Sequence, residues 1–126
     1  MFWLVQLSMA ALRNKDGQFV SPSIASTAAA IAASEAVLAQ DVRTPIVNAP
    51  GAQSYPIAAL TFLLVYQDQK DATKARTFID FVRWALHDGQ TYCEALDYVP
   101  LPAAIVQQDE ATLGRITVNG QPVPPA

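Results

Sequence analysis

The pattern of apolar and polar positions divides the chain into helix-period segments separated by turns, with one continuous apolar run in its middle. From residue 22 to about residue 38, apolar residues recur with the period of a helix, and Ile24, Ile31 and Leu38 mark its buried face. Ser21 and Pro22 precede this pattern. Because a serine hydroxyl can accept from free backbone N–H groups and proline suits the first helical position, we expect Ser21 to cap this helix.

A long amphipathic helix is expected after the polar turn at residues 67–70. Its apolar positions recur at three- and four-residue steps and are Phe78, Ile79, Val82, Ala85 and Leu86. Phe81 and Trp84 widen this stripe, and we expect them in the core rather than at a ligand. The pair Asp88-Gly89 ends the helix, since glycine is the usual residue just beyond a helical C-terminus.

Shorter elements follow from turn and cap residues. Asp88 is a candidate cap for a short helix over residues 90–96. A last helix is expected at residues 103–113. The sequences Asn14-Lys15-Asp16-Gly17 and Asn119-Gly120 both predict tight turns, because asparagine, aspartate and glycine tolerate the backbone angles of a reversal.

The continuous apolar run at residues 60–66 predicts a strand. It follows a connection at residues 40–53 that prolines interrupt, and it holds aliphatic, aromatic and β-branched residues without alternation. Such runs are typical of central strands covered on both faces. No other segment of similar strength is present to pair with it, and a lone buried strand leaves its backbone groups unsatisfied. We therefore expect its sheet to come from residues outside this chain or from another molecule.

Composition suits one domain of unusually apolar character. The 126 residues are 52% hydrophobic and 15% charged, against about 25% charged in typical soluble domains; the alanines of the first helix explain part of this excess. The net charge is −3 and basic residues are scattered, so no stripe for nucleic acid is present. Residues 1–10 are apolar but lack a basic n-region, so we interpret them as the end of an internal element rather than a signal peptide.

Catalytic chemistry is weakly represented. His87 is the only histidine and stands at a helix end, where we expect it to meet the terminal carbonyls or solvent. Cys93 is the only cysteine and is expected to be a small core residue. A hydrolase that uses His87 and Cys93 is a remote alternative. The carboxylates lie at turns and helix edges, and no metal spacing, phosphate loop or dinucleotide fingerprint is present. We expect no enzyme, no metal and no cofactor.

Several stretches together resemble the PstS family of periplasmic phosphate-binding proteins. They cover nearly the whole chain from about Leu7 in the order of the family: residues 11–23, 46–57, 62–72, 78–86, 89–90 and 96–102. The last three stretches are the most specific, and the co-occurrence of all six carries the resemblance.

The resemblance implies part of a two-lobed α/β fold, the type II periplasmic-binding-protein fold, in a mostly helical fragment with one buried strand. Residues 1–54 would belong to one lobe, residues 55–66 would return to the other, and residues 67–126 would form its C-terminal helices, with a hinge near residues 55–59. The family's phosphate ligands lie in earlier segments, and Ser21 and Ser54 match none of their motifs. We expect no phosphate-binding residue in this stretch.

The function implied is that of the C-terminal part of a substrate-binding protein for high-affinity phosphate uptake by an ABC transporter. The implied partners are inorganic phosphate, in the full-length protein only, and the membrane permease subunits; the implied location is the periplasm or the cell surface. The alternative is an independent small helical module that dimerises through its apolar strand. A dimer in solution would favour the module.

Overall fold

The computed structural model describes residues 8–123, so residues 1–7 of the expected internal element lie outside the described part. The chain forms two compact units, residues 1–59 and residues 60–126. Both combine helices with short strands, and the sheet of the second contains parallel and antiparallel pairs. This mixture confirms the expected α/β class. Within residues 8–123, no helix has the length and apolar character needed to cross a membrane.

The first unit begins with a two-stranded antiparallel hairpin of β1 (Leu12–Arg13) and β2 (Phe19–Val20), in which Leu12 lies opposite Val20. The predicted turn joins these strands. Its reversal depends on Gly17, whose φ of 83° is easily adopted only by a residue without a β-carbon. The backbone N–H of Gly17 donates to the Asn14 carbonyl at 2.9 Å and closes the turn.

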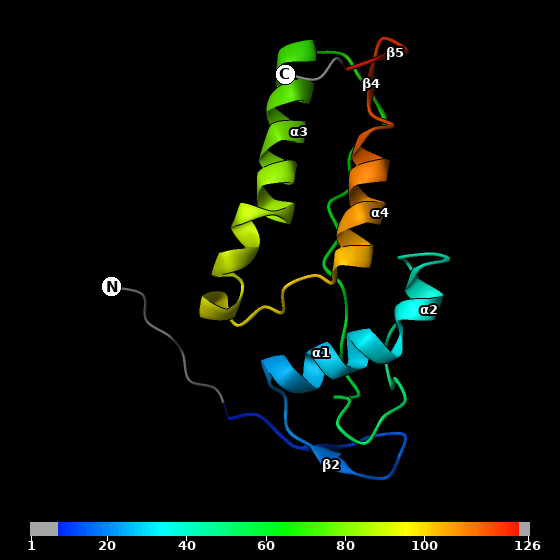
Figure 1. Ribbon diagram of the computed structural model, residues 1–126, viewed down its shortest axis with the longest axis vertical. Coiled ribbons are helices and arrows are strands. Elements are labelled where there is room, and N and C mark those ends of the chain that lie inside the picture. Colours follow the sequence, from blue (N-terminus) through cyan, green and yellow to red (C-terminus); the bar gives the residue numbers. More distant parts are fainter. Residues whose placement is uncertain (1–7, 124–126) are drawn as a thin grey trace. The chain divides into compact units, whose positions relative to one another are not determined.

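The first expected helix is shorter than its pattern and is broken. It forms α1 (Ile24–Ala33) and a single further turn, α2 (Glu35–Leu38), which Figure 1 shows beside the hairpin. The break lies at Ser34, whose hydroxyl donates to the Ala30 carbonyl at 2.9 Å. A serine that bonds back to the preceding turn competes with the helical ladder and bends it.

The capping residue of α1 is Ser23, so the expectation for Ser21 was wrong. The hydroxyl of Ser23 accepts from the Ser26 backbone N–H at 3.1 Å, while the Ser26 hydroxyl accepts from the Ser23 backbone N–H at 2.9 Å. This reciprocal capping box satisfies two N–H groups that the helix leaves free. Residue 22 therefore stays outside the helix.

Small aliphatic residues form the core of the first unit. Ile31 and Leu38 are buried as expected, whereas Ile24 is only half-buried. The expected irregular connection at residues 40–53 is confirmed, since it contains no helix or strand. The buried apolar residues of this unit are Val20, Ala30, Ile31, Leu38, Ile46, Ala49 and Ala58.

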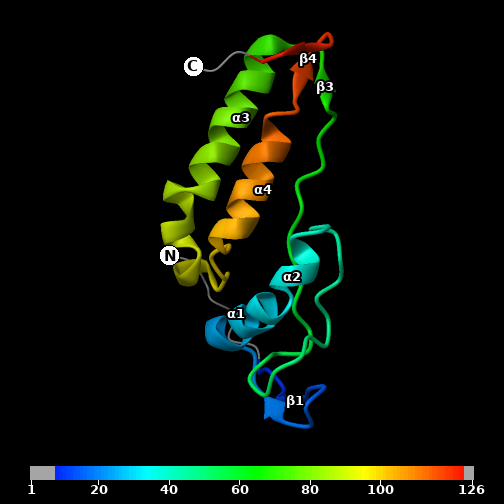
Figure 2. The same ribbon diagram turned by 45° about the vertical axis from the view of Figure 1, so that its right-hand side comes forward.

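The second unit is built on two helices, α3 (Ala72–Leu86) and α4 (Ala103–Leu113), which lie side by side in Figures 1 and 2. Both match the pattern from which they were predicted. The Asp71 carboxylate begins α3 by accepting from the N–H groups of Thr73 and Lys74 at 3.0 and 3.1 Å. A carboxylate at this position also meets the positive end of the helix dipole.

The short helix expected at residues 90–96 consists of two 3₁₀ turns, η1 (Asp88–Tyr92) and η2 (Glu94–Leu96). Asp88 lies inside η1 and does not cap it. A reversal is required within this segment, and Asp97 makes it with a φ of 61°. Tight 3₁₀ turns suit short connectors of this kind better than a full α-helix.

Three short strands complete the second unit in the order β3-β4-β5: β3 (Asp68–Gln69), β4 (Thr117–Val118) and β5 (Gln121–Pro122). β3 pairs parallel with β4, and β4 pairs antiparallel with β5. The segment expected as a polar turn thus contains a strand. The Asn119-Gly120 turn is confirmed, and both of its residues have positive φ, 49° and 76°, as a two-residue hairpin loop requires.

The core of the second unit lies between the two helices and the sheet. Its buried members are Ile79, Leu86, Leu113 and Ile116, with Phe78, Val82, Leu101, Val106 and Val123 packed against them. Phe81 and Trp84 are not part of it, contrary to expectation, because they lie on the opposite side of α3, with 57% and 47% of their surface exposed. The apolar stripe of α3 is wider than the surface that α4 covers.

The strongest strand prediction, residues 60–66, was wrong for this structure. The segment has no strand assignment, and residues 61–66 are all exposed. Figure 2 shows it as an extended trace that leads into β3. The physical reason is the one that the pattern implied: an isolated segment becomes a strand only when a neighbour accepts its backbone hydrogen bonds.

Candidate functional site

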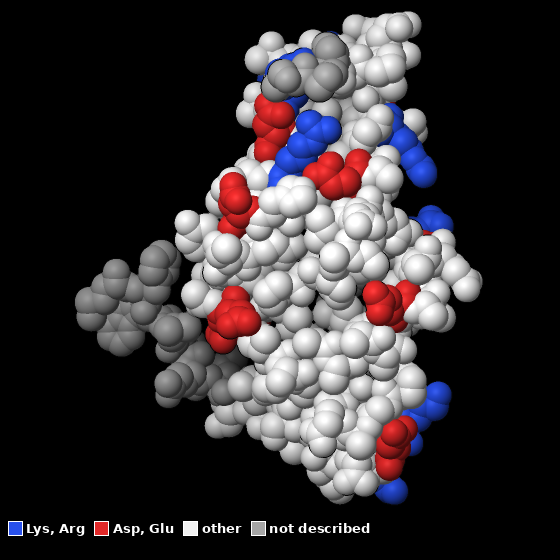
Figure 3. Space-filling view, in the orientation of Figure 1, with Lys and Arg blue, Asp and Glu red and all other residues white. Residues whose placement is uncertain are grey.

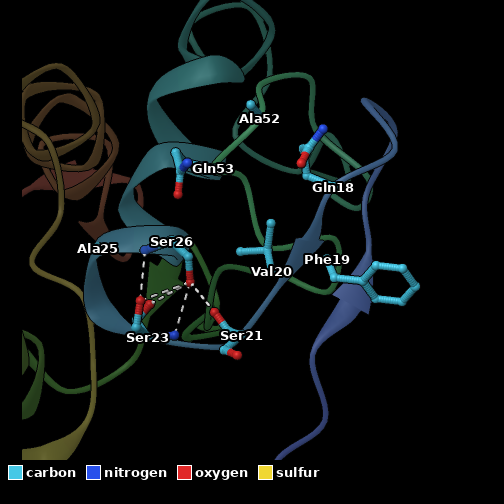
Figure 4. Close-up of a pocket in the computed structure, with 9 residues that line it drawn as sticks. All are labelled: Gln18, Phe19, Val20, Ser21, Ser23, Ala25, Ser26, Ala52 and Gln53. Atoms are coloured by element: carbon cyan, nitrogen blue, oxygen red, sulfur yellow. Dashed lines mark hydrogen bonds between the residues drawn. The ribbon is translucent and has the colours of Figure 1, made fainter.

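The best-formed hollow of the first unit lies between the hairpin, the start of α1 and the connection that follows α2 (Figure 4). Its volume is about 400 Å³ and it is open to solvent. The residues that line it are Gln18, Phe19, Val20, Ser21, Ser23, Ala25, Ser26, Ala52 and Gln53. Both serines of the capping box are among them, so the local chemistry of helix capping also builds this pocket.

The hydroxyl groups of the pocket are largely engaged within the protein. The Ser26 hydroxyl lies 2.9 Å from the Ser21 carbonyl oxygen and 3.0 Å from the Ser23 hydroxyl. Figure 4 shows these contacts converging on one side of the pocket. Ser21 is exposed and contributes its carbonyl to this network. The network orders the start of α1 and leaves few hydroxyl hydrogens for a ligand.

The lining of the pocket is uncharged. None of its nine residues is Lys, Arg, His, Asp or Glu. A strong anion site normally combines backbone N–H groups with a cationic side chain or a helix N-terminus, and here the start of α1 is already capped by Ser23. The pocket therefore offers weak polar contacts and apolar surface, without the charge that phosphate capture favours.

Asn14 is the most connected polar side chain of the first unit, and sequence reasoning missed its role. It is buried, and its amide nitrogen donates to the carbonyls of Gly51, Ala52 and Ser54 at 3.0, 3.1 and 3.2 Å. Its side-chain oxygen accepts from the N–H groups of Asp16 and Gln18 at 3.1 and 3.0 Å. Asn14 thus joins the hairpin to a connection about forty residues away. The only local signal was the preference of asparagine for turns.

Ser54, the second serine considered from the sequence, is fully buried. Its hydroxyl donates to the Pro50 carbonyl at 2.7 Å, and its carbonyl accepts from Asn14. Gly51 fits beside it, because a β-carbon there would lie 2.9 Å from the Ser54 hydroxyl oxygen. Ser54 is therefore a structural residue that closes a tight loop.

In the second unit, His87 and Cys93 have different partners. The His87 Nε2 atom lies 3.0 Å from a Glu110 carboxylate oxygen, and the Arg83 Nε atom lies 3.6 Å from the other oxygen of that carboxylate. Cys93 is half-buried, with its sulfur 3.8 Å from the Gln90 side-chain oxygen. Glu110 thus links the end of α3 to α4, a structural arrangement rather than a nucleophile with its base.

The carboxylates of the chain serve turns, caps and ion pairs. The backbone N–H of Gly120 and the hydroxyl of Thr117, each 2.7 Å from the Asp68 carboxylate, hold the pKa of Asp68 below its usual value. Hydrogen bonds from Arg43 lower the pKa of the exposed Asp41 to about 2. Burial raises the pKa of Asp109. Within residues 8–123, no three His, Cys, Asp or Glu side chains gather to hold a metal ion.

Charged side chains are interspersed on the surface. On the face drawn in Figure 3, basic and acidic residues lie in small mixed groups, with no continuous basic patch. This distribution agrees with the absence of a basic stripe in the sequence and with the net charge of −3.

An aromatic surface covers the outer side of α3. The ring centroids of Phe81 and Trp84 are 6.0 Å apart, and those of Trp84 and Tyr92 are 6.2 Å apart. A shallow apolar hollow of about 370 Å³ adjoins it and is lined by Thr73, Lys74, Thr77, Phe78 and Phe81. The hollow carries a single cationic group at its rim and no acid–base pair, so it is a packing surface rather than a reaction site.

Comparison with known proteins gives consistent relatives, although no family model matches the chain. The chain is 40% identical over 106 residues to the phosphate-binding protein PstS of Xylella fastidiosa, and 36% identical over 106 residues to that of Pasteurella multocida. It is 35% identical over 126 residues to PstS of Methanocaldococcus jannaschii, with 90% of the chain covered.

These matches cover 84% of the chain in the two bacterial cases but only 29% and 31% of the relatives. The match to the archaeal protein likewise covers 31% of it. The chain therefore spans less than a third of the length of the proteins it matches. The resemblance inferred from the sequence is confirmed: over most of its length, this chain is a relative of the phosphate-binding protein PstS.

Proposed function

We propose that this chain is the C-terminal part of a substrate-binding protein that captures inorganic phosphate for uptake by an ABC transporter. The observation that carries the proposal is the 40% identity to a phosphate-binding protein over 84% of the chain. In a complete protein of this kind, the chain would serve as scaffold in the periplasm or at the cell surface. Membrane permease subunits would be its partners there, and it would have no catalytic role.

The phosphate ligands belong, in this proposal, to segments outside the chain. Three observations support this assignment: the pocket of the first unit has no charged lining, the hydroxyl of Ser54 is buried and bonded to Pro50, and Ser26 is engaged in the capping box. A site that holds phosphate needs several donors aimed at one point. None of the serines considered contributes to such a group.

We further propose that residues 1–54 belong to one lobe, residues 67–126 to the other, and residues 55–66 to the return between them. The boundary between the two compact units, after residue 59, falls within this return segment. A hinge near residues 55–59 would absorb backbone rotation at an element end. Comparison of the backbone angles in liganded and ligand-free forms of a complete protein tests this, and unchanged angles there would contradict the hinge.

Calorimetric titration with phosphate tests the function in two samples. The chain alone should show no binding in the micromolar range. A single polypeptide that joins this chain to the part of Xylella fastidiosa PstS outside the 106 matched residues should bind phosphate. Micromolar binding by the chain alone would overturn the assignment of ligands to other segments. A folded joined protein without phosphate binding would overturn the proposed function.

A further inference from the structure

The extended segment that precedes β3 is the most exposed apolar part of the second unit. Leu64 exposes 97% of its surface and Tyr66 86%, and their neighbours on the opposite side, Leu63 and Val65, expose 65% and 45%. Successive side chains of an extended chain point to opposite faces. Both faces of this segment are therefore apolar and uncovered.

Both backbone edges of the segment are open as well. Among the residues that the structure describes, no backbone–backbone hydrogen bond involves residues 60–66. The ladder with β4 starts only beyond them, where the Thr117 N–H donates to the Gln67 carbonyl at 2.8 Å and the Asn119 N–H to the Gln69 carbonyl at 3.1 Å. In the order β3-β4-β5, the far side of β3 has no neighbour.

Nothing in the sequence of the segment discourages further pairing. Edge strands that must stay unpaired usually carry charges, prolines or bulges. Residues 60–66 contain no charged residue and no proline, and the first charge after them is Asp68. The charge and the paired β3 begin together, so the chemistry changes where the sheet of this unit ends.

We propose that residues 60–66 are an acceptor strand that takes one strand on each edge from the remaining part of a PstS-type protein, and that this part also covers both faces. The proposal rests on the proposed function, since it takes the missing partner to be the rest of such a protein. It assigns this chain a specific assembly surface. Main-chain hydrogen bonds would supply the pairing, and the apolar side chains would supply the burial.

A second copy of this chain is a poorer occupant. A twofold dimer pairs the same edge of each copy, so the other edge and much of both faces would stay in water. The remaining part of a relative has the required size, because the chain matches only 29% of the Xylella fastidiosa protein. A continuous apolar run that is covered on both faces is typical of a sheet with layers on each side.

The test mixes this chain with the part of Xylella fastidiosa PstS outside the 106 matched residues, produced separately. Light scattering should show a one-to-one complex. Hydrogen exchange of residues 60–66 should slow on the order of 100-fold on mixing, because ladder amides are protected and free ones are not. The single joined polypeptide supplies the same exchange measurement if the separate part does not fold, and protection should be present there.

Two matched variants place the contact. Leu64→Lys puts a charge at a position that is 97% exposed in the chain alone, so it should leave the chain unchanged but weaken the complex at least ~10-fold. Leu96→Lys makes the same change at another exposed leucine, 67% exposed in η2, and should leave the complex intact. Equal weakening by both variants would contradict an acceptor role for residues 60–66.

The remaining outcomes separate this proposal from the proposed function. A concentration-dependent homodimer with protection of residues 60–66 would overturn it in favour of a second copy. A joined protein that binds phosphate while residues 60–66 exchange freely would overturn it and leave the proposed function standing. Protection of the segment in a joined protein without phosphate binding would support the acceptor strand and overturn the function.

Discussion

The amide nitrogen of Asn14 donates to the carbonyl of Ser54 at 3.2 Å, and this hydrogen bond connects a hairpin turn to a loop 40 residues later in the chain. The same nitrogen also bonds the carbonyls of Gly51 and Ala52. A neutral amide suits the position, because three carbonyl oxygens face its nitrogen and two backbone N–H groups face its oxygen. This residue organises the first unit more than any serine that the sequence singled out.

Replacement of Asn14 by alanine should destabilise the first unit by about 2 kcal/mol or more, since it leaves buried carbonyl groups without donors. Urea unfolding, with hydrogen exchange at residues 12–20 as a local probe, measures the effect. Gln53→Ala is the matched control, because Gln53 is an exposed amide in the connected loop. Equal stability of the two variants would show that the Asn14 bonds are dispensable.

Asn14→Asp separates the two halves of this side chain. A carboxylate keeps an acceptor for the N–H groups of Asp16 and Gln18 but faces the three carbonyls with negative charge. At neutral pH we expect a loss of stability at least as large as that of the alanine variant. A markedly milder effect would place most of the contribution in the acceptor half, and the same urea titration decides.

The cap of α1 offers a comparison between two nearby serines. Ser23→Ala removes the acceptor of the Ser26 N–H and should cost about 1 kcal/mol, with faster amide exchange in the first turn of α1. Ser21→Ala should change neither quantity, because Ser21 contributes a backbone carbonyl to the network. The opposite ranking would restore Ser21 as the capping residue.

Two leucines of the second unit should respond very differently to the same substitution. Leu113 is buried against α3 with 7% exposure, and Leu113→Ala should cost about 2–5 kcal/mol. Leu64 is 97% exposed, and Leu64→Ala should stay within ~0.5 kcal/mol in the chain alone. Thermal or urea unfolding of both variants checks this, and a large cost at Leu64 would show that residues 60–66 pack within the chain.

Asp68 should make the stability of the second unit depend on acid. Its folded pKa is lowered by the Gly120 N–H and the Thr117 hydroxyl, so the unfolded chain binds the proton more readily. Its contribution is present above the ordinary carboxyl pKa of about 3.9 and is lost as the pH falls through the lower folded value. Asp68→Asn should therefore destabilise at neutral pH and have little effect near about pH 2.

Asp109 should show the opposite sign. Burial raises its folded pKa, so the ionised carboxylate opposes folding once the pH exceeds that value. Asp109→Asn should raise the unfolding midpoint at neutral pH, and the gain should vanish in acid where both states of the native carboxyl are protonated. Unfolding midpoints over the two pH ranges measure both variants, and equal signs would contradict these assignments.

Residues within a few positions of one another decided much of the local structure. The Asn119-Gly120 turn, the glycine turn before β2 and both helices of the second unit were predicted from the sequence and confirmed. Turn angles, caps and helical periodicity depend on local backbone strain and on neighbours within one helical turn. The family relationship was also visible in the sequence, because it rests on the order of residues.

Contacts between distant segments decided the rest. The amphipathic pattern of α3 did not show that α4 would cover only one side and leave Phe81 and Trp84 exposed, nor did a turn asparagine reveal three carbonyls about forty residues away. The apolar run at residues 60–66 has the composition of a central strand, yet a strand exists only when another segment completes its hydrogen bonds. Sequence by itself determined what this segment requires, and tertiary structure decided that within this chain the requirement is unmet.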